Sequence, residues 1–79
     1  MYVSFVGLSV DLNDEERVIA SLVNMDRVVE VYTMMGPFEL FAKVEAETIK
    51  QLEATIAEIQ ALPGVLRSFN FLSVQQKKG

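Results

Sequence analysis

The alternation of apolar and polar positions along the chain predicts four strands and two helices. Dense runs of β-branched and aromatic residues predict strands over residues 2–10, 28–35, 38–45 and 65–74. Apolar residues spaced three and four apart predict one helix that begins near Asn13 and a second from about Glu47. Two sets of residues are expected to share one face of their strand: Tyr2, Val6, Leu8 and Val10 in the first, and Phe38, Leu40, Ala42 and Val44 in the third.

Residues with special backbone roles mark where the predicted elements begin and end. Asn13 is expected to cap the first helix, with Glu16 completing a capping box three residues later. The sequence Leu62-Pro63-Gly64 ends the second helix, because proline cannot continue it and glycine releases the backbone. Gly36-Pro37 marks a turn between the second and third strands.

The predicted order is βαββαβ, and a weak internal repeat supports two similar halves. At an offset of 37 residues, Met25 falls on Leu62 and Tyr32 falls on Phe69. Two βαβ halves predict a ferredoxin-like α+β sandwich, in which a four-stranded antiparallel sheet carries both helices on one face. Right-handed crossovers would place the first and third strands at the centre of the sheet. We expect a single domain over residues 1–75 and a flexible tail at 76–79.

Both faces of the predicted sheet are apolar, although a monomer needs only one apolar face. Phe5, Met35 and Phe41 cannot all lie beneath two short helices, because residues such as Val6 and Leu8 compete for that space. A chain of 79 residues that is 51% hydrophobic would therefore expose an apolar patch. We expect a face-to-face dimer whose interface includes Phe5, Met35 and Phe41. The alternative is that some of these residues line a twisted edge.

Charge and composition exclude several classes of partner. The net charge of −4 argues against nucleic-acid binding, which needs clustered Lys and Arg on one face. The absence of cysteine removes any disulfide framework and suits a reducing cytoplasm. The N-terminal residues lack the features of a signal peptide, and no apolar run approaches the roughly 20 residues that span a bilayer. We expect a soluble cytoplasmic domain with no membrane partner.

The chain offers few residues for catalysis. It has no His, Cys or Trp, and so lacks the imidazole base, the thiol nucleophile and the imidazole metal ligand. Asp14, Glu15 and Glu16 are better explained as acids at the start of a helix than as a metal cluster. No glycine-rich phosphate loop occurs. We expect a binding protein rather than an enzyme, with no catalytic residue, metal or cofactor.

Two short motifs resemble those of a known family. Gly36-Pro37-Phe38-Glu39 stands where that family has G-x-x-D, and Leu62-Pro63-Gly64-Val65 matches its L-P-G-V element. Ser68 and Asn70 fall at two positions that are threonine in the family. In motif order and spacing, nearly the whole chain resembles the effector-binding (RAM) domain of the Lrp/AsnC, or feast/famine, regulators.

The resemblance implies a ferredoxin-like domain that dimerises through its sheet and assembles further, often into a ring of four dimers. It implies that an amino acid or related small molecule binds in a cleft between dimers, near the G-x-x-D turn. Full-length members carry an N-terminal helix-turn-helix that this sequence lacks. The resemblance is therefore to a stand-alone form, for which direct DNA binding is not expected.

On the same basis, the expected ligand site comprises Gly36, Pro37, Phe38, Glu39, Ser68 and Asn70. The carboxylate of Glu39 would pair with a ligand's ammonium, and backbone N–H groups near Gly36 would bind the ligand's carboxylate. Glu39 in place of Asp, Pro37 in the turn and the two replaced threonines depart from the family pattern and indicate an altered ligand or a lost site. Alternatively, Glu39 pairs with Lys43 or another base, and Ser68 and Asn70 only interrupt an exposed strand.

The sequence therefore favours an effector-binding and oligomerisation domain that senses an amino acid or modulates a transcription regulator. One alternative is a structural interaction module that forms mixed oligomers with a full-length Lrp-type regulator. A second is an enzyme of the dimeric ferredoxin-like barrel type, which the absence of His disfavours.

Overall fold

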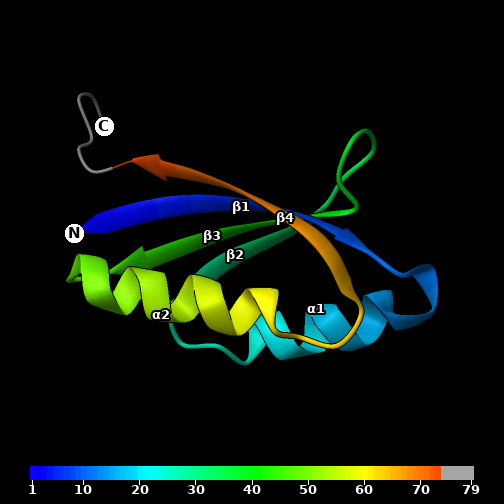
Figure 1. Ribbon diagram of the computed structural model, residues 1–79, viewed down its shortest axis with the longest axis horizontal. Coiled ribbons are helices and arrows are strands. Elements are labelled where there is room, and N and C mark those ends of the chain that lie inside the picture. Colours follow the sequence, from blue (N-terminus) through cyan, green and yellow to red (C-terminus); the bar gives the residue numbers. More distant parts are fainter. Residues whose placement is uncertain (74–79) are drawn as a thin grey trace.

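The computed structural model describes residues 1–73, so the tail predicted at 76–79 lies outside the described residues. Four strands and two α-helices follow one another in the predicted order (Figure 1). Their bounds are β1 Tyr2–Val10, a short 3₁₀ helix Leu12–Asp14, α1 Glu15–Val23, β2 Val28–Thr33, β3 Leu40–Ala46, α2 Ile49–Gln60 and β4 Val65–Ser73.

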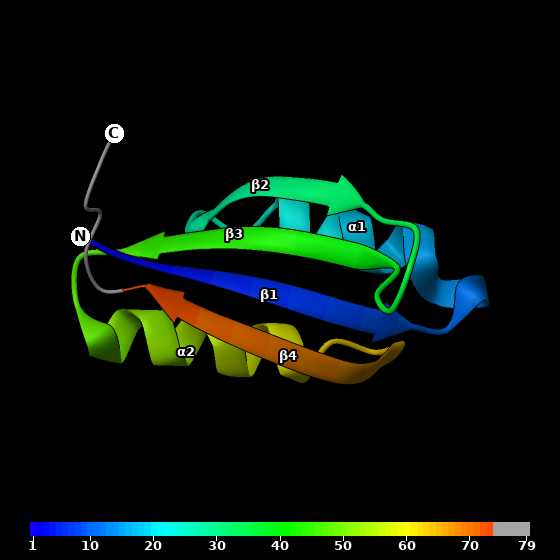
Figure 2. The same ribbon diagram turned by 90° about the horizontal axis from the view of Figure 1, so that it is seen from above.

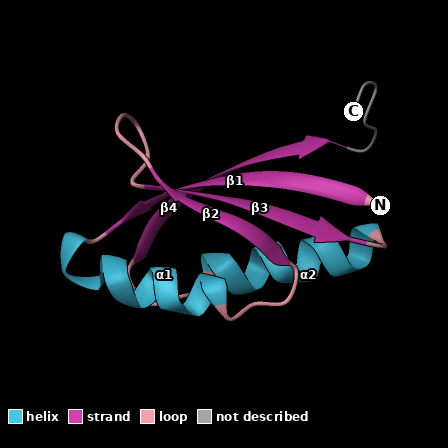
Figure 3. Ribbon diagram, turned by 180° about the vertical axis from the view of Figure 1, so that it is seen from behind, coloured by secondary structure: helices cyan, strands magenta, loops and turns pink. Residues whose placement is uncertain are grey.

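The sheet has the strand order β2-β3-β1-β4, and every neighbouring pair is antiparallel (Figure 2). The first and third strands are therefore central, as the right-handed crossovers predict. Both helices lie on the same face of the sheet (Figure 3). The predicted ferredoxin-like α+β fold is confirmed. Among residues 1–73, neither helix has the length and apolar character that crossing a membrane requires.

The core lies between the sheet and the two helices. Alternate residues of the central strands are buried there, including Val6, Leu8, Leu40 and Val44, which have no exposed surface. The helices cover them with four buried side chains: Val18, Leu22, Leu52 and Ile59. Each fully buried aliphatic side chain contributes roughly 1.5–3 kcal/mol relative to exposure, so this layer is a large favourable contribution to folding. Within it, the hydroxyl of Ser4 is buried and has no hydrogen-bond partner among the described residues.

Three predicted element boundaries are wrong. The strand predicted over residues 28–35 ends at Thr33, so residues 34 and 35 belong to the following loop. The carboxylate of Asp11, rather than Asn13, caps the start of the first helical segment, because its Oδ1 accepts the N–H of Asn13 at 2.9 Å. The segment begins with the 3₁₀ turn, and α1 follows from Glu15. The strand β3 begins at Leu40 instead of Phe38, since the ring of Phe38 turns away from the buried face and lies over Gly7 of β1.

The internal repeat appears in the structure as two helix-to-strand turns with the same hydrogen bonds. In each turn, three N–H groups donate to carbonyl groups at matching positions, 37 residues apart: Asn24 to Ala20, Met25 to Leu22 and Val28 to Met25 in the first, and Ala61 to Ala57, Leu62 to Ile59 and Val65 to Leu62 in the second. The predicted similarity of the two halves is therefore confirmed at the level of backbone geometry.

The sheet face opposite the helices, called the open face below, carries six aromatic side chains: Phe5, Tyr32, Phe38, Phe41, Phe69 and Phe71. Phe71 is 52% exposed, Tyr32 51% and Phe69 37%. Phe5 stacks on Phe41 with ring centroids 5.7 Å apart. No described helix or loop covers the centre of this face, as Figures 1 and 3 show. The expected two-sided apolar character of the sheet is therefore present.

Candidate functional site

The connection between β2 and β3, residues 34–39, rises from the end of the sheet on the open-face side (Figure 1). Glu39 fixes its base to β1. The Oε1 of Glu39 accepts the backbone N–H of Val10 at 2.8 Å and the hydroxyl of Ser9 at 3.3 Å. The backbone of Glu39 also donates to the carbonyl of Leu8 at 3.0 Å and accepts the N–H of Met34 at 2.9 Å. Four hydrogen bonds thus hold this residue in place.

The carboxylate of Glu39 was expected to pair either with a ligand's ammonium or with Lys43 or another base. Glu39 does not pair with Lys43, because the ammonium of Lys43 lies 3.5 Å from Glu45 instead. The alternative of an ion pair with Lys43 is therefore wrong. Since the described bonds use only Oε1, the second carboxylate oxygen has no partner among residues 1–73.

Phe38 packs the same loop onto the open face. A Cβ atom added at Gly7 would lie 2.8 Å from Cδ2 of Phe38, so the ring occupies the space that a side chain on β1 would fill. Phe38 also contacts Phe69 of β4, with ring centroids 5.0 Å apart and planes tilted by 51°. The guanidinium of Arg67 lies 5.1 Å from the centroid of Phe69, at a distance typical of a cation–π contact.

The tip of the loop is open to solvent. Met35 is 99% exposed, and Gly36 adopts a φ of 130°, which an L side chain rarely adopts. Nothing lies within 4 Å of a Cβ placed at Gly36, so that glycine serves the backbone conformation and not close packing. Phe38 and Glu39 hold the loop against the sheet, and the residues at its tip are exposed. Such a loop is suited to contact a ligand or another chain.

Ser68 and Asn70 do not join Phe38 and Glu39 within one chain. In the β1–β4 register Ser68 pairs with the buried Leu8 and Asn70 with the buried Val6, so both belong to the helix side of the sheet. The hydroxyl of Ser68 accepts a hydrogen bond from Nε2 of Gln60 in α2 at 2.9 Å. The six expected ligand residues therefore form two groups on opposite sides of the sheet.

Sequence reasoning missed Ser9, Arg67 and Phe69 as neighbours of the loop. Ser9 and Arg67 are directly opposite each other in the β1–β4 register, and Phe69 is opposite Gly7. The available signal was the two-residue period of a strand: if Ser68 faces one way, Arg67 and Phe69 face the other. Ser68 and Asn70 were predicted instead, because they fall at the two positions that are threonine in the family.

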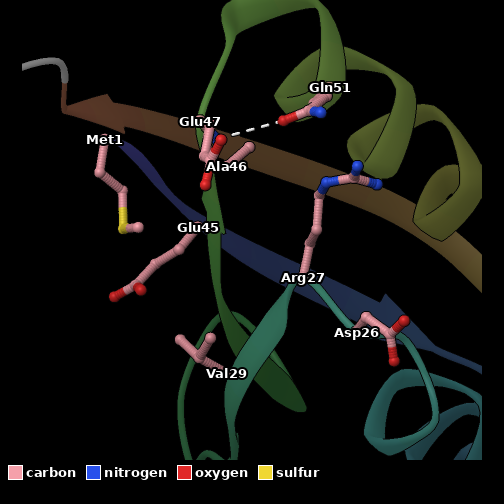
Figure 4. Close-up of a pocket in the computed structure, with 8 residues that line it drawn as sticks. All are labelled: Met1, Asp26, Arg27, Val29, Glu45, Ala46, Glu47 and Gln51. Carbon is pink, nitrogen blue, oxygen red and sulfur yellow. Dashed lines mark hydrogen bonds between the residues drawn. The ribbon is translucent and has the colours of Figure 1, made fainter.

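Another hollow lies at the end of the sheet opposite the loop, and Figure 4 shows the residues that line it. It measures about 430 Å³ and is lined in part by Asp26, Arg27, Glu45 and Glu47. It contains none of the expected site residues. Across residues 1–73, no three acidic side chains are arranged to hold a metal ion. This hollow therefore does not replace the loop as a candidate site.

One tyrosine on the open face has a perturbed pKa. The phenol of Tyr32 donates a hydrogen bond to Oε1 of Glu30 at 2.9 Å. This hydrogen bond, and then the negative charge of Glu30, raise the pKa of Tyr32 above its ordinary value. Tyr32 therefore remains a neutral hydrogen-bond donor throughout the physiological pH range.

The chain is similar to known proteins in both sequence and structure. The model of the Lrp/AsnC ligand binding domain matches residues 3–79. The chain belongs to this family. It is 33% identical over 73 residues to the regulatory protein AsnC of Haemophilus influenzae, covering 90% of this chain and 49% of that protein. The chain thus spans about half the length of this curated relative.

Solved structures agree on the fold of this Lrp/AsnC domain. The protein TTHA0845 from Thermus thermophilus superposes with a TM-score of 0.91 at 25% identity and covers 100% of both chains. AsnC of E. coli superposes with a TM-score of 0.87 at 24% identity, covering 99% of this chain and 54% of that one. Family and relative are regulatory, which points to a regulatory effector-binding domain and away from an enzyme.

Proposed function

We propose that this Lrp/AsnC domain binds an amino acid or related small molecule and assembles through the open face of its sheet, thereby sensing an effector or modulating a transcription regulator in the cytoplasm. The observation that carries the proposal is the group of six aromatic side chains on that face. Contiguous exposed apolar patches of this kind mark interaction sites on soluble proteins.

The magnitude of the apolar term favours association. Covering even ~300 Å² of apolar surface contributes about 7.5 kcal/mol at roughly 25 cal/mol per Å². The loss of translational and rotational freedom offsets part of this gain. Phe5 and Phe41 lie at the centre of the patch, and Met35 stands at the tip of a loop that rises on the same side, so all three are proposed interface residues.

Assembly also offers a way to complete the ligand site. Gly36, Pro37, Phe38 and Glu39 lie on the open-face side, whereas Ser68 and Asn70 lie on the helix side of the edge strand β4. A cleft between dimers, in which the loop of one copy meets the β4 edge of another, would join the two groups. A ring of dimers, as in an octamer, is one arrangement that produces such contacts.

Sedimentation and calorimetry test the two parts of the proposal separately. We expect the wild-type chain to sediment as a dimer or larger at micromolar concentration, and Phe41→Asp to shift it toward monomer. Leu12→Asp adds the same charge at another exposed apolar residue, 77% exposed and off the open face, and should not change the mass. A well-folded wild-type monomer at that concentration would contradict the assembly proposal.

Titration of the twenty standard amino acids into the wild-type protein tests ligand binding. Heat with at least one of them is expected, and its absence for all twenty at protein well above micromolar would remove the sensing role. The open face would still support the second candidate, a structural module that pairs with the equivalent sheet of a longer regulator. Co-purification with such a regulator, unchanged by Glu39→Ala, would favour that second function.

A further inference from the structure

The end of the sheet beside the loop places a carboxylate and a guanidinium on either side of one serine. Ser9 donates its hydroxyl to Oε1 of Glu39, and Arg67 is the residue directly opposite Ser9 on β4. Side chains that are directly opposite on one sheet face have Cβ atoms about 5 Å apart. Glu39, Ser9 and Arg67 therefore follow one another across the open-face side of this end.

Both charged groups retain unused hydrogen-bonding capacity. Within residues 1–73, the guanidinium of Arg67 has no hydrogen-bond or ion-pair partner, whereas Arg17 pairs with Asp14 and Lys43 with Glu45. Its described contact is with the ring of Phe69, which restrains its position but uses none of its N–H donors. Glu39 uses one oxygen, and its other oxygen is available.

We infer that Arg67 is a specificity-determining residue of the loop site. Its guanidinium binds the carboxylate of a zwitterionic ligand, and the second carboxylate oxygen of Glu39 binds the ammonium of the same ligand. This inference rests on the proposed function and deepens it. A planar guanidinium can hold a carboxylate through two parallel hydrogen bonds, which a point charge cannot do. The Phe38–Phe69 pair lies beside both groups and provides an apolar surface for the ligand's side chain.

Arg67 also resolves a shortage of donors in the loop. Pro37 has no N–H, so the turn offers one donor fewer to a ligand carboxylate than a turn with an ordinary residue there. The guanidinium of Arg67 on the neighbouring strand replaces that donor with a stronger one, because hydrogen bonds between charged groups are shorter and stronger than those between neutral groups. The site then requires both charges of the ligand, and a simple amine or a simple carboxylic acid would satisfy only half of it.

The test compares each amino acid that binds the wild type with its α-amide, which keeps the ammonium and loses the carboxylate. For the wild type, we expect the amide to bind about 10- to 100-fold more weakly, the range that follows from one charge-assisted interaction. In Arg67→Gln, amino acid and amide should bind equally, both near the wild-type affinity for the amide. Arg67→Lys should restore part of the preference. Arg17→Gln is the matched control, because it removes an exposed guanidinium on α1 and should preserve the full preference.

Two outcomes separate this inference from the function on which it rests. If no amino acid binds the wild type, the proposed ligand role fails, and with it this site. If amino acids bind and Arg67→Gln keeps the wild-type preference for acid over amide, the ligand role stands and the assignment of Arg67 is overturned. A role for Arg67 limited to packing on Phe69 would lower binding of acid and amide equally, which also overturns it.

Discussion

Substitutions of Glu39 test whether its carboxylate supports the loop by accepting hydrogen bonds. Glu39→Ala removes the acceptor for the N–H of Val10 and the hydroxyl of Ser9, both in part-buried positions. An unpaired buried donor costs about 1–3 kcal/mol, and partial burial places the expected loss of unfolding free energy at about 1–2 kcal/mol. For a chain of this size, 1 kcal/mol corresponds to about 4–8 °C in Tm.

Glu39→Gln separates hydrogen bonding from charge. The side-chain amide retains a carbonyl oxygen that can accept both bonds, so its loss of stability should be below about 1 kcal/mol. Urea unfolding and thermal unfolding at one fixed protein concentration measure both variants, because assembly makes Tm depend on concentration. Glu53→Ala, on the exposed side of α2, is the control and should change the free energy of unfolding little.

An unchanged unfolding temperature for Glu39→Ala would contradict this prediction, because the side-chain hydrogen bonds of Glu39 would then contribute nothing to the free energy of unfolding. Equal losses for the alanine and glutamine variants would show that the charge of Glu39, and not its acceptor oxygen, supports the loop. Under the zwitterion proposal, Glu39→Gln has a further result: it should weaken amino-acid binding while leaving the fold intact.

Three other predictions concern single side chains. Gly7→Ala should lower stability by about 1–3 kcal/mol through overpacking, because the added methyl group meets the ring of Phe38, and thermal unfolding measures the loss. Ser4→Ala should raise stability by about 1 kcal/mol or more in urea unfolding, because it removes a buried hydroxyl without a partner; a loss of stability would indicate a partner that the described residues do not provide. The phenol of Tyr32 should ionise above the ordinary pKa of tyrosine in an ultraviolet titration, and Glu30→Gln should lower that pKa toward the ordinary value; identical titration curves would contradict the hydrogen bond.

The sequence predicted the architecture because the architecture depends on repeated local patterns. Alternation in β1 and β3 identifies the buried face, and the repeat at 37 residues identifies two equal halves. The order and spacing of the family motifs agreed with the strands and helices that these patterns predict. The prediction failed where a single contact between distant residues decides the conformation. Phe38 continues the alternation of β3, yet its ring lies over Gly7, a space that the β3 sequence alone does not reveal.

The candidate site was predicted less completely for the same reason. The partners of Glu39 are 29 and 30 positions away in the sequence, and they become neighbours only through the pairing of β1 with β3. Arg67 becomes their neighbour only through the pairing of β1 with β4. The sequence identified the loop and the acid, whereas the sheet register determines which groups lie beside them.

The position of β1 has a consequence for synthesis of the protein. Of the four strands, β1 leaves the ribosome first, and one of its two neighbours in the sheet is β4, the strand that leaves last. Until β4 has emerged, the nascent chain presents one bare edge of a strongly apolar strand, and bare strand edges promote aggregation. The complete sheet therefore forms only after β4 is made, and a chain that terminates before β4 should become a substrate for chaperones and proteases.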